Sequence, residues 1–189
     1  MINITQKPCS NWNERDGFKP EIIVVHIAAG SLSSMDSWFA FKGSMVSAHY
    51  GTSEDGKEVH QYVAEDKAAW GCGKVRNPSF KLFKPNINPN KYTINIENAG
   101  VDLSLASSAQ LSTLSELIKD IAGRYKIPLD RDHIIGHYEV NPIDKPFCPS
   151  KTHSVMDKLV SDLTAEEWVC VMCPRSKVEL TKMFIKNLK

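Results

Sequence analysis

Two histidines and one cysteine have the side chains and positions that could together bind a metal ion. His26 ends the apolar segment EIIVVHI, His137 ends the short segment IIGH, and Cys148 lies in the Pro-rich loop that follows. Zinc prefers imidazole nitrogen and thiolate sulfur, and a catalytic zinc has three protein ligands and a fourth position for water. Each residue also has an ordinary structural interpretation, since the three form no compact ligand motif in the sequence.

Glu97 and Lys145 could complete such a site. Glu97 is at the end of YTINIE, where apolar and polar residues alternate so that one face of the predicted strand is polar. A carboxylate at this position could act as general base for a zinc-bound water, or it could be a solvated charge at the strand end. Lys145, three residues before Cys148, could stabilise a developing oxyanion or lie on the surface.

The elements that must position these side chains alternate between strands and helices. Apolar runs and alternating patterns predict strands, and apolar residues at helical spacing predict helices. In chain order they are a strand at 21–27, a helix at 33–42, a hairpin of 46–52 and 58–63, a strand at 92–97, a helix at 107–125, a strand at 134–137 and a helix at 152–163. This order predicts an α/β fold with a central mixed β-sheet flanked by helices.

Local signals predict where some of these elements begin and end. Ser33 or Ser34 is expected to cap the first helix, and Gly43 is expected to end it. Ser107 begins a capping box at the start of the second helix. Residues 71–91 are a long loop rich in Gly and Pro, and long loops in compact domains are often functional.

The composition is typical of a globular domain. The 189 residues are 42% hydrophobic and 24% charged, and the formal net charge is +1. A near-neutral chain provides no electrostatic footprint for nucleic acid as its main partner. No apolar run approaches the roughly 20 residues that span a bilayer, which excludes a membrane-spanning protein. The N-terminus has no signal-peptide pattern, so the protein is expected to be made in the cytoplasm.

The five cysteines are too few for a disulfide scaffold, and their number is odd. A zinc ligand at Cys148 leaves Cys9, Cys72, Cys170 and Cys173 without a task. The spacing Cys170-x-x-Cys173 resembles half a zinc knuckle or a redox pair. With no second pair in the sequence, we interpret it as structural or incidental.

Six motifs occur in an order that is typical of one enzyme family. They are VVHIAAG, VSAHYGTSEDG, VHQYV, AAWGCG, YTINIENAG and IIGHYEVNPIDKPFCPS. The chain resembles type 2 N-acetylmuramoyl-L-alanine amidases over residues 21–163. This family includes phage endolysin amidases and is similar in fold to peptidoglycan recognition proteins. Cys148 within a Cys-Pro dipeptide resembles phage and prophage endolysins, because muropeptide-recycling relatives often have Asp at this position.

The resemblance implies a zinc hydrolase that acts on peptidoglycan or muropeptides. It would cleave the amide between the lactyl group of N-acetylmuramic acid and L-alanine. By position in the motifs, His26, His137 and Cys148 correspond to the zinc ligands and Glu97 to the catalytic carboxylate. Lys145 falls near the oxyanion-stabilising lysine of the family.

Two further residues are candidates for substrate binding. His49, in VSAHYG, could contact substrate, or it could have a structural role behind a ligand. Trp70 and the loop after it could line a groove for glycan or peptide, or Trp70 could belong to the core. Many relatives have His after Ala69-Trp70, whereas this chain has Gly71, so a substrate-contacting His is absent there.

The C-terminal residues 164–189 are predicted to be a basic helical extension of a zinc amidase domain at 1–163. From residue 175 onward, basic residues exceed acidic ones by four. Three alternatives to a phage endolysin remain open at this point: a non-catalytic peptidoglycan-binding module, a cytoplasmic recycling amidase, and a regulatory protein that interacts through the basic extension. An endolysin would reach the cell wall from the cytoplasm through a separate membrane pore.

Overall fold

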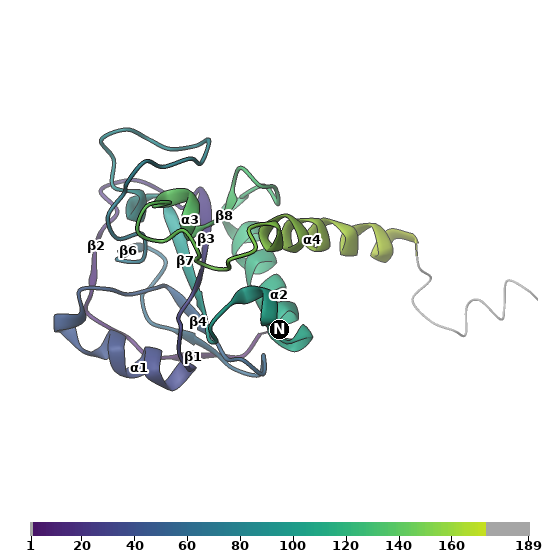
Figure 1. The fold of residues 1–189 in the computed structure, drawn as a ribbon, viewed down its shortest axis with the longest axis horizontal. Coiled ribbons are helices and arrows are strands. Elements are labelled where there is room, and N and C mark those ends of the chain that lie inside the picture. Colours follow the sequence, from purple (N-terminus) through teal and green to yellow (C-terminus); the bar gives the residue numbers. More distant parts are fainter. Residues whose placement is uncertain (1, 173–189) are drawn as a thin grey trace, which may run out of the picture.

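The computed structural model describes residues 2–172, with side chains described up to residue 165. A six-stranded sheet forms the centre of the molecule, with helices on both of its faces (Figure 1). Across the sheet the order is β1 (Ile4–Gln6), β5 (Val59–Gln61), β4 (Tyr50–Thr52), β7 (Thr93–Asn98), β3 (Ile22–Ile27) and β8 (Ile134–Gly136).

The sheet is mixed, as the sequence predicts. Strands β4, β7, β3 and β8 run parallel, so their carboxyl ends lie along one edge. Strand β4 pairs with β5 in the predicted antiparallel hairpin. Gly56 in its turn has φ +69°, and a Cβ there would come within 2.4 Å of the Ala109 backbone. Glycine therefore permits both the left-handed turn and the close approach to the following helix.

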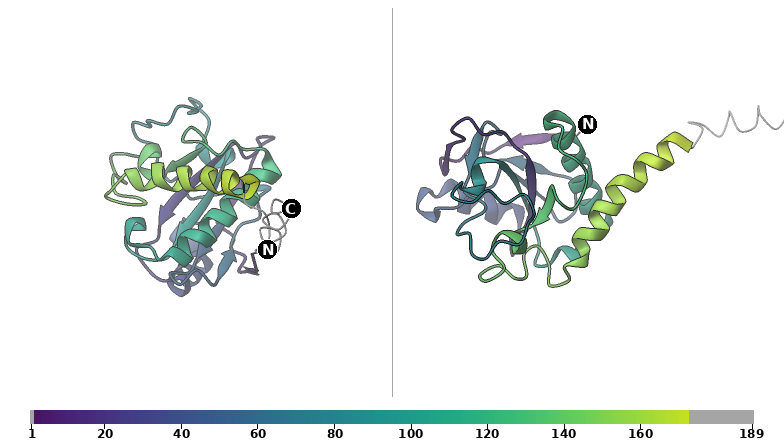
Figure 2. Two further views of the ribbon diagram at one scale, coloured as in Figure 1. Left: turned by 90° about the vertical axis from the view of Figure 1, so that its right-hand side faces the viewer. Right: turned by 90° about the horizontal axis from the view of Figure 1, so that it is seen from above.

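One face of the sheet packs against two long helices, α2 (Ser108–Tyr125) and α4 (Ser154–Met172). Because side chains alternate along a strand, Ile23 and Val25 of β3 and Ile94 and Ile96 of β7 all point to this face. They form the main core with apolar side chains of both helices. Helix α4 crosses beside α2 and extends away from the sheet (Figure 2).

The opposite face is covered by α1 (Leu32–Ala40) and by the long loop after residue 70, which contains the 3-10 helix η2 (Pro89–Lys91). Tyr92, Phe80 and Val24 form a second apolar cluster under this loop. Beside it, β2 (Trp12–Glu14) pairs with β6 (Lys67–Ala69) in a small antiparallel sheet that the sequence did not predict.

The caps explain where the first two helices begin. The predicted cap of α1 at Ser33 or Ser34 is wrong, because the Ser31 hydroxyl accepts the Ser34 N–H at 3.2 Å. Helix α1 ends at Ala40 with Phe41 as its C-cap, before Gly43, and η1 (Lys42–Ser44) follows. Ser107 caps α2 as predicted, since its hydroxyl accepts the backbone N–H of Gln110 at 3.1 Å. The Gln110 side chain donates to the Ala99 carbonyl at 2.8 Å, which is not the bond of the predicted capping box.

Two C-terminal elements differ from the prediction. His137 begins a short helix, α3 (His137–Val140), where a strand ending on His137 was expected. Helix α4 continues past Leu163, which is fully buried, to Met172. The division into a domain at 1–163 and an extension stays a prediction, and residues 173–189 of the expected helical extension lie outside the described residues. Within residues 2–172, none of the helices combines the length and apolar character that crossing a membrane requires.

Candidate metal centre and its pocket

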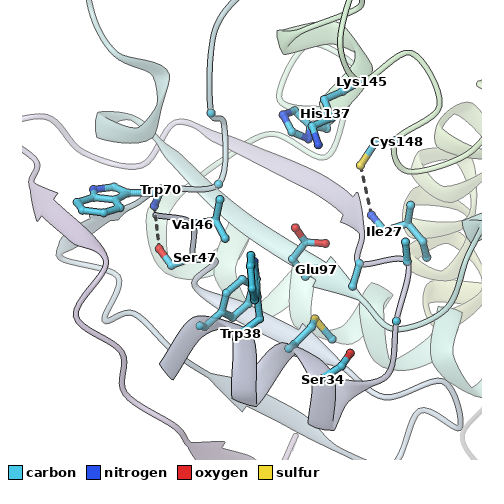
Figure 3. A pocket seen from close by; sticks show the side chains of 17 residues that line it. Ile27, Ser34, Trp38, Val46, Ser47, Trp70, Glu97, His137, Lys145 and Cys148 are labelled. Carbon is cyan, nitrogen blue, oxygen red and sulfur yellow. Dashed lines mark hydrogen bonds between the residues drawn. The ribbon is translucent and has the colours of Figure 1, made fainter. Parts of the chain in front are cut away.

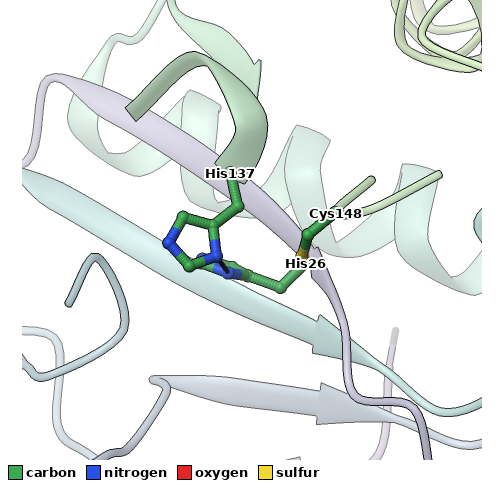
Figure 4. A group of neighbouring side chains, drawn as sticks. All are labelled: His26, His137 and Cys148. Atoms are coloured by element: carbon green, nitrogen blue, oxygen red, sulfur yellow. Dashed lines mark hydrogen bonds between the residues drawn. The ribbon is translucent and has the colours of Figure 1, made fainter. Parts of the chain in front are cut away.

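The candidate ligands converge where the parallel strands end. His26 is the fifth residue of β3, Glu97 lies beside it in register on β7, and His137 directly follows β8. Open α/β sheets commonly bind ligands at the carboxyl ends of their strands. The loop between α3 and α4 brings Cys148 to the same point (Figure 4).

The geometry of these three side chains fits one metal ion. One ligand atom from each of His26, His137 and Cys148 lies within 4.8 Å of the others. The two Nδ1 atoms of the histidines are 3.0 Å apart. A tetrahedral zinc with Zn–N bonds of about 2.0–2.1 Å holds two nitrogens about 3.3 Å apart, which is close to this separation. The Cys148 sulfur accepts the backbone N–H of Ile27 at 3.4 Å.

Outer hydrogen bonds assign the tautomer of both histidines. The His26 Nε2–H donates to the Asn95 side-chain oxygen at 2.9 Å. The His137 Nε2–H donates to the Cys72 carbonyl at 3.2 Å. Each ring therefore has its lone pair on Nδ1, and the two lone pairs face each other. A cation between them turns this repulsion into attraction, and the N, N, S donor set suits zinc.

The protonation states are consistent with a metal centre. Burial holds the pKa of His26 well below its usual range, and it lowers the pKa of His137 to about 4. Both imidazoles are thus neutral, as ligands must be. Burial raises the pKa of the Cys148 thiol to about 12, and the nearby Glu97 carboxylate adds to this effect. A positive ion at the site is what would allow Cys148 to become the thiolate that binds metal.

Glu97 is mostly buried beside the candidate ligands and is not a solvated strand end. Its side chain is only 19% exposed, and its Oε1 lies 3.9 Å from His26 Nδ1. Its Oε2 is buried and accepts no hydrogen bond from any part of the chain that the structure describes. Burial raises the pKa of Glu97 to about 7, and the charge of Lys145 opposes that rise. The free oxygen can accept a proton near neutral pH.

A pocket of about 510 Å³ opens over these residues. Its lining includes Glu97, His137, Lys145 and Cys148, so the structure brings Lys145 to the same cavity as the candidate ligands. Figure 3 shows Glu97 between Trp38, on α1, and the group of His137, Lys145 and Cys148. The arrangement combines candidate metal ligands, a carboxylate and a lysine at one cavity.

Trp70 lies in the lining of this pocket, which agrees with its predicted position along a groove and not with a position in the core. Its ring is half-buried, and its indole N–H donates to the Asn13 side-chain oxygen at 2.5 Å. The backbone N–H of Trp70 donates to the Ser47 hydroxyl at 2.9 Å. These bonds hold one face of the pocket wall in place, and substrate contact by Trp70 stays a prediction.

His49 does not reach the pocket, so its predicted contact with substrate is corrected. Its side chain is fully buried, and its Nδ1 accepts the backbone N–H of Asn95 at 2.9 Å. Its Nε2–H donates to the Lys67 carbonyl at 3.0 Å. Burial, together with the charge of Arg15, lowers the pKa of His49 to about 3. Both ring nitrogens are thus used within the fold, which is the structural role that the sequence left as an alternative.

Three groups at the site were missed by the sequence reasoning. They are the Asn95 side chain, the Cys72 carbonyl and the Trp38 ring, which is 54% exposed at the pocket. The alternation of YTINIE places Asn95 on the same face as Glu97, so a signal for Asn95 was present. A backbone carbonyl such as that of Cys72 has no residue-specific signal in a sequence.

Comparison with known proteins identifies one family. The sequence profile described as N-acetylmuramoyl-L-alanine amidase matches residues 16–151. A similar curated protein is the 1,6-anhydro-N-acetylmuramyl-L-alanine amidase AmpD of Enterobacter cloacae, which is 33% identical over 85 residues. The aligned part covers 45% of this chain and 41% of the length of that protein.

Solved structures share the fold. A selenomethionine derivative of AmpD superposes with a TM-score of 0.69 and 24% identity, over 86% of this chain and 95% of that one. A mutant endolysin from Bacillus subtilis gives a TM-score of 0.64 and 22% identity, over 86% and 99% of the two chains. At these identities the likeness shows the fold alone.

Proposed function

This chain belongs to the N-acetylmuramoyl-L-alanine amidase family, and on that premise we propose that it is a zinc-dependent hydrolase of peptidoglycan. The bond cleaved is the amide between the lactyl group of N-acetylmuramic acid and L-alanine. The observation that carries the proposal is the convergence of two neutral imidazoles, one cysteine and one free buried carboxylate oxygen in a single pocket.

Zinc is the cofactor that the donor set fits best. His26 and His137 would hold it through Nδ1, and Cys148 would hold it through its sulfur. When bound, zinc polarises the scissile carbonyl and lowers the pKa of an attacking water. The Asn95 and Cys72 oxygens keep both imidazoles in the tautomer that exposes Nδ1.

Glu97 moves the proton in the reaction. Its free Oε2 accepts a proton from the attacking water as the water oxygen bonds to the lactyl carbonyl carbon. The same oxygen then donates this proton to the amide nitrogen as the C–N bond breaks. The products are a lactyl carboxylate on the sugar and a peptide that begins with the free amine of L-alanine.

Lys145 stabilises the charge that develops on the carbonyl oxygen. Its ammonium lines the same pocket as Glu97, and its charge is felt by both histidines and by Cys148. A fixed cation next to the oxyanion lowers the barrier without accepting a proton itself.

Retention of these groups favours an enzyme over a binding module. A module that only recognises peptidoglycan needs neither a metal nor a base, yet His26, His137, Cys148 and Glu97 are all present. The test is to incubate the purified protein with peptidoglycan and to measure new amino termini of L-alanine. We expect them with zinc and not with a chelator. Their absence in the presence of zinc would overturn the enzymatic proposal.

The finer role that we propose is that of a phage or prophage endolysin, acting on the polymeric wall after release from the cytoplasm. The Cys148-Pro149 dipeptide supports the endolysin role, because it resembles the sequence of endolysins at this position. Recycling of soluble muropeptides is a second candidate, supported by the similarity to AmpD. Initial rates on intact sacculi and on soluble 1,6-anhydro muropeptides decide between them. Faster cleavage of sacculi supports the endolysin, and cleavage of soluble substrate alone refutes it.

For residues 164–189 we propose an extension that binds the wall. Its excess of basic residues supports attraction to an anionic cell surface. Because α4 runs to Met172, the protein truncated after Met172 is the variant to compare with the full chain. We expect weaker binding of the truncated protein to cell walls, and equal binding would refute this role.

A further inference from the structure

The side chain of Asn95 lies behind the proposed metal centre, between His26 and the segment that begins at Gly71. We propose that Asn95 is a positioning residue for His26 and that Gly71 is small because the Asn95 amide fills the space beside it. The inference rests on the proposed metal centre and deepens it, because it assigns the groups that set the direction of the ligand atoms.

Several hydrogen bonds fix the Asn95 side chain and backbone. Its Oδ1 accepts the His26 Nε2–H at 2.9 Å, and its Nδ2 donates to the Thr93 hydroxyl at 3.2 Å. Its backbone N–H donates to His49 Nδ1 at 2.9 Å. Asn95 is fully buried, so no water competes for these bonds. The Asn95 Oδ1 also accepts a hydrogen bond from the Cys72 thiol at 3.5 Å, and this second donor keeps the oxygen on the His26 side.

This oxygen determines which nitrogen of His26 faces the pocket. With an acceptor at Nε2, the ring proton stays on Nε2 and the lone pair stays on Nδ1. Without the acceptor, the buried Nε2–H would have no partner within the described chain, and the alternative tautomer would be favoured. That tautomer places a proton where the metal must bind.

Gly71 is matched to the Asn95 side chain. A Cβ at position 71 would come within 2.5 Å of the Asn95 Cγ and 2.7 Å of its Cβ and Oδ1. The Asn95 Cβ is fixed by the strand β7, so the amide could not move aside and keep its bond to His26. Any larger residue at position 71 is therefore expected to displace the Asn95 oxygen from His26.

The same segment also orients the second ligand. Cys72, next to Gly71, accepts the His137 Nε2–H on its carbonyl at 3.2 Å. The Cys72 N–H donates to the Asn90 side-chain oxygen at 2.9 Å, which fixes the neighbouring peptide between Gly71 and Cys72. Asn95 and the adjacent Cys72 thus provide the acceptors for the outer nitrogens of the two imidazoles.

The first test compares two replacements of Asn95. Asn95→Leu removes the acceptor at similar volume, and Asn95→Asp keeps an oxygen acceptor for His26. Zinc affinity is measured by competition with a chromophoric chelator, and the visible spectrum of the cobalt-loaded protein reports the geometry at the metal. We expect about 10- to 100-fold weaker zinc binding for Asn95→Leu, with a changed cobalt spectrum. Asn95→Asp should bind zinc within about threefold of the wild type.

Gln110→Met is the matched control, because it removes another buried amide that bonds to the Ala99 carbonyl and to no candidate ligand. It should leave zinc affinity unchanged. If the wild type binds zinc and Asn95→Leu binds it equally well, the role of Asn95 is overturned while the proposed function stands. If the wild type itself binds no zinc, the proposed metal centre is overturned.

The second test addresses Gly71 and remains informative if Asn95→Leu fails to fold. Gly71→Ala should weaken zinc binding, because the new Cβ displaces the Asn95 amide. In the Asn95→Gly background all three clashing atoms are gone, so Gly71→Ala should add no further loss. Equal losses from Gly71→Ala in both backgrounds would show that the two residues act independently and would overturn the proposed match.

Discussion

Replacing Glu97 by Gln should stabilise the metal-free protein at alkaline pH while it strongly reduces turnover of the zinc-loaded protein. The reason is that Glu97 has one buried oxygen with no hydrogen-bond partner among the described residues. An ionised carboxylate in that position costs the fold free energy, because burial penalises its charge. Gln has nearly the same shape, carries no charge and cannot accept a proton from water.

The size of this effect follows from the pKa of Glu97. Burial raises it from an ordinary value of 4.5 to about 7. Each pKa unit corresponds to about 1.4 kcal/mol, so ionised Glu97 destabilises the folded state by about 3 kcal/mol. Because the folded state binds this proton more tightly than the unfolded state, the penalty is absent below pH 4.5. It grows as the pH rises to 7 and is complete above that.

The assay is urea unfolding of the metal-free wild type and the variant at pH 5 and pH 8. The variant should gain about 2 to 3 kcal/mol more at pH 8 than at pH 5, relative to the wild type. Any pH-independent cost of the new amide cancels in this difference. Glu116→Gln, which changes an exposed carboxylate on α2, is the matched control for the charge change itself.

Activity of the same variant completes the test. With zinc restored, Glu97→Gln should lose about 10²- to 10⁴-fold in kcat, the usual contribution of a general base. Its zinc content should match the wild type, since Glu97 is not one of the proposed ligands. A stability difference that is the same at pH 5 and pH 8, or a variant that retains wild-type turnover, would refute this reasoning.

Three further predictions test other parts of the account. Cys148→Ala should lower the zinc bound per chain, and an unchanged stoichiometry measured by atomic absorption would remove Cys148 from the ligand set. Lys145→Met should reduce kcat by about 10²- to 10³-fold with zinc content intact, whereas a change in KM alone would argue against oxyanion stabilisation. Ile121→Ala, at a fully buried position of α2, should cost about 2–5 kcal/mol in urea unfolding, and a cost below about 1 kcal/mol would contradict its place in the core.

Long periodic segments were predictable from the sequence, whereas three of the three-residue strands were missed. The apolar run of β3 and the helical spacing of α2 extend over enough residues to define a period. Strands β1, β2 and β6 have three residues each, which is too short for any period. Strand β1 forms by pairing with β5 at the edge of the six-stranded sheet, and β2 and β6 form by pairing with each other.

The alternation of polar and apolar residues in β7 was predicted correctly, but this pattern does not determine whether the polar face is buried. Thr93 and Asn95 are fully buried, although they alternate with apolar residues as on a half-exposed strand. The long loop at 71–91 and helix α1 cover this face, and hydrogen bonds to His26 and His49 satisfy Asn95. Which loop covers which face depends on tertiary contacts.

The residues at which helices and strands begin and end were equally hard to predict. Helix α1 has serines at 31, 33 and 34, any of which could cap it, and only the backbone path selects Ser31. Glu139 accepts the Gly136 N–H at 2.8 Å and so ends β8 one residue before the prediction. The result places His137 at the first position of a helix, where its ring turns toward His26.

The candidate site was largely predictable because its chemistry depends on residue types. His26, His137, Cys148, Glu97 and Lys145 were all selected from the sequence, and the structure brings them to one pocket or its floor. For His49, chemistry alone was misleading, since an imidazole near a site serves equally well as a buried hydrogen-bond partner.

The central claim is that the chain hydrolyses the bond between the lactyl carbonyl and L-alanine, and digestion of peptidoglycan in ¹⁸O-labelled water tests it most directly. Mass spectrometry of the products should find the heavy oxygen in the lactyl carboxylate of muramic acid, with an unlabelled peptide that begins at L-alanine. Label at a sugar C1 or in a peptide carboxylate would show a glycosidase or a peptidase and would contradict the account.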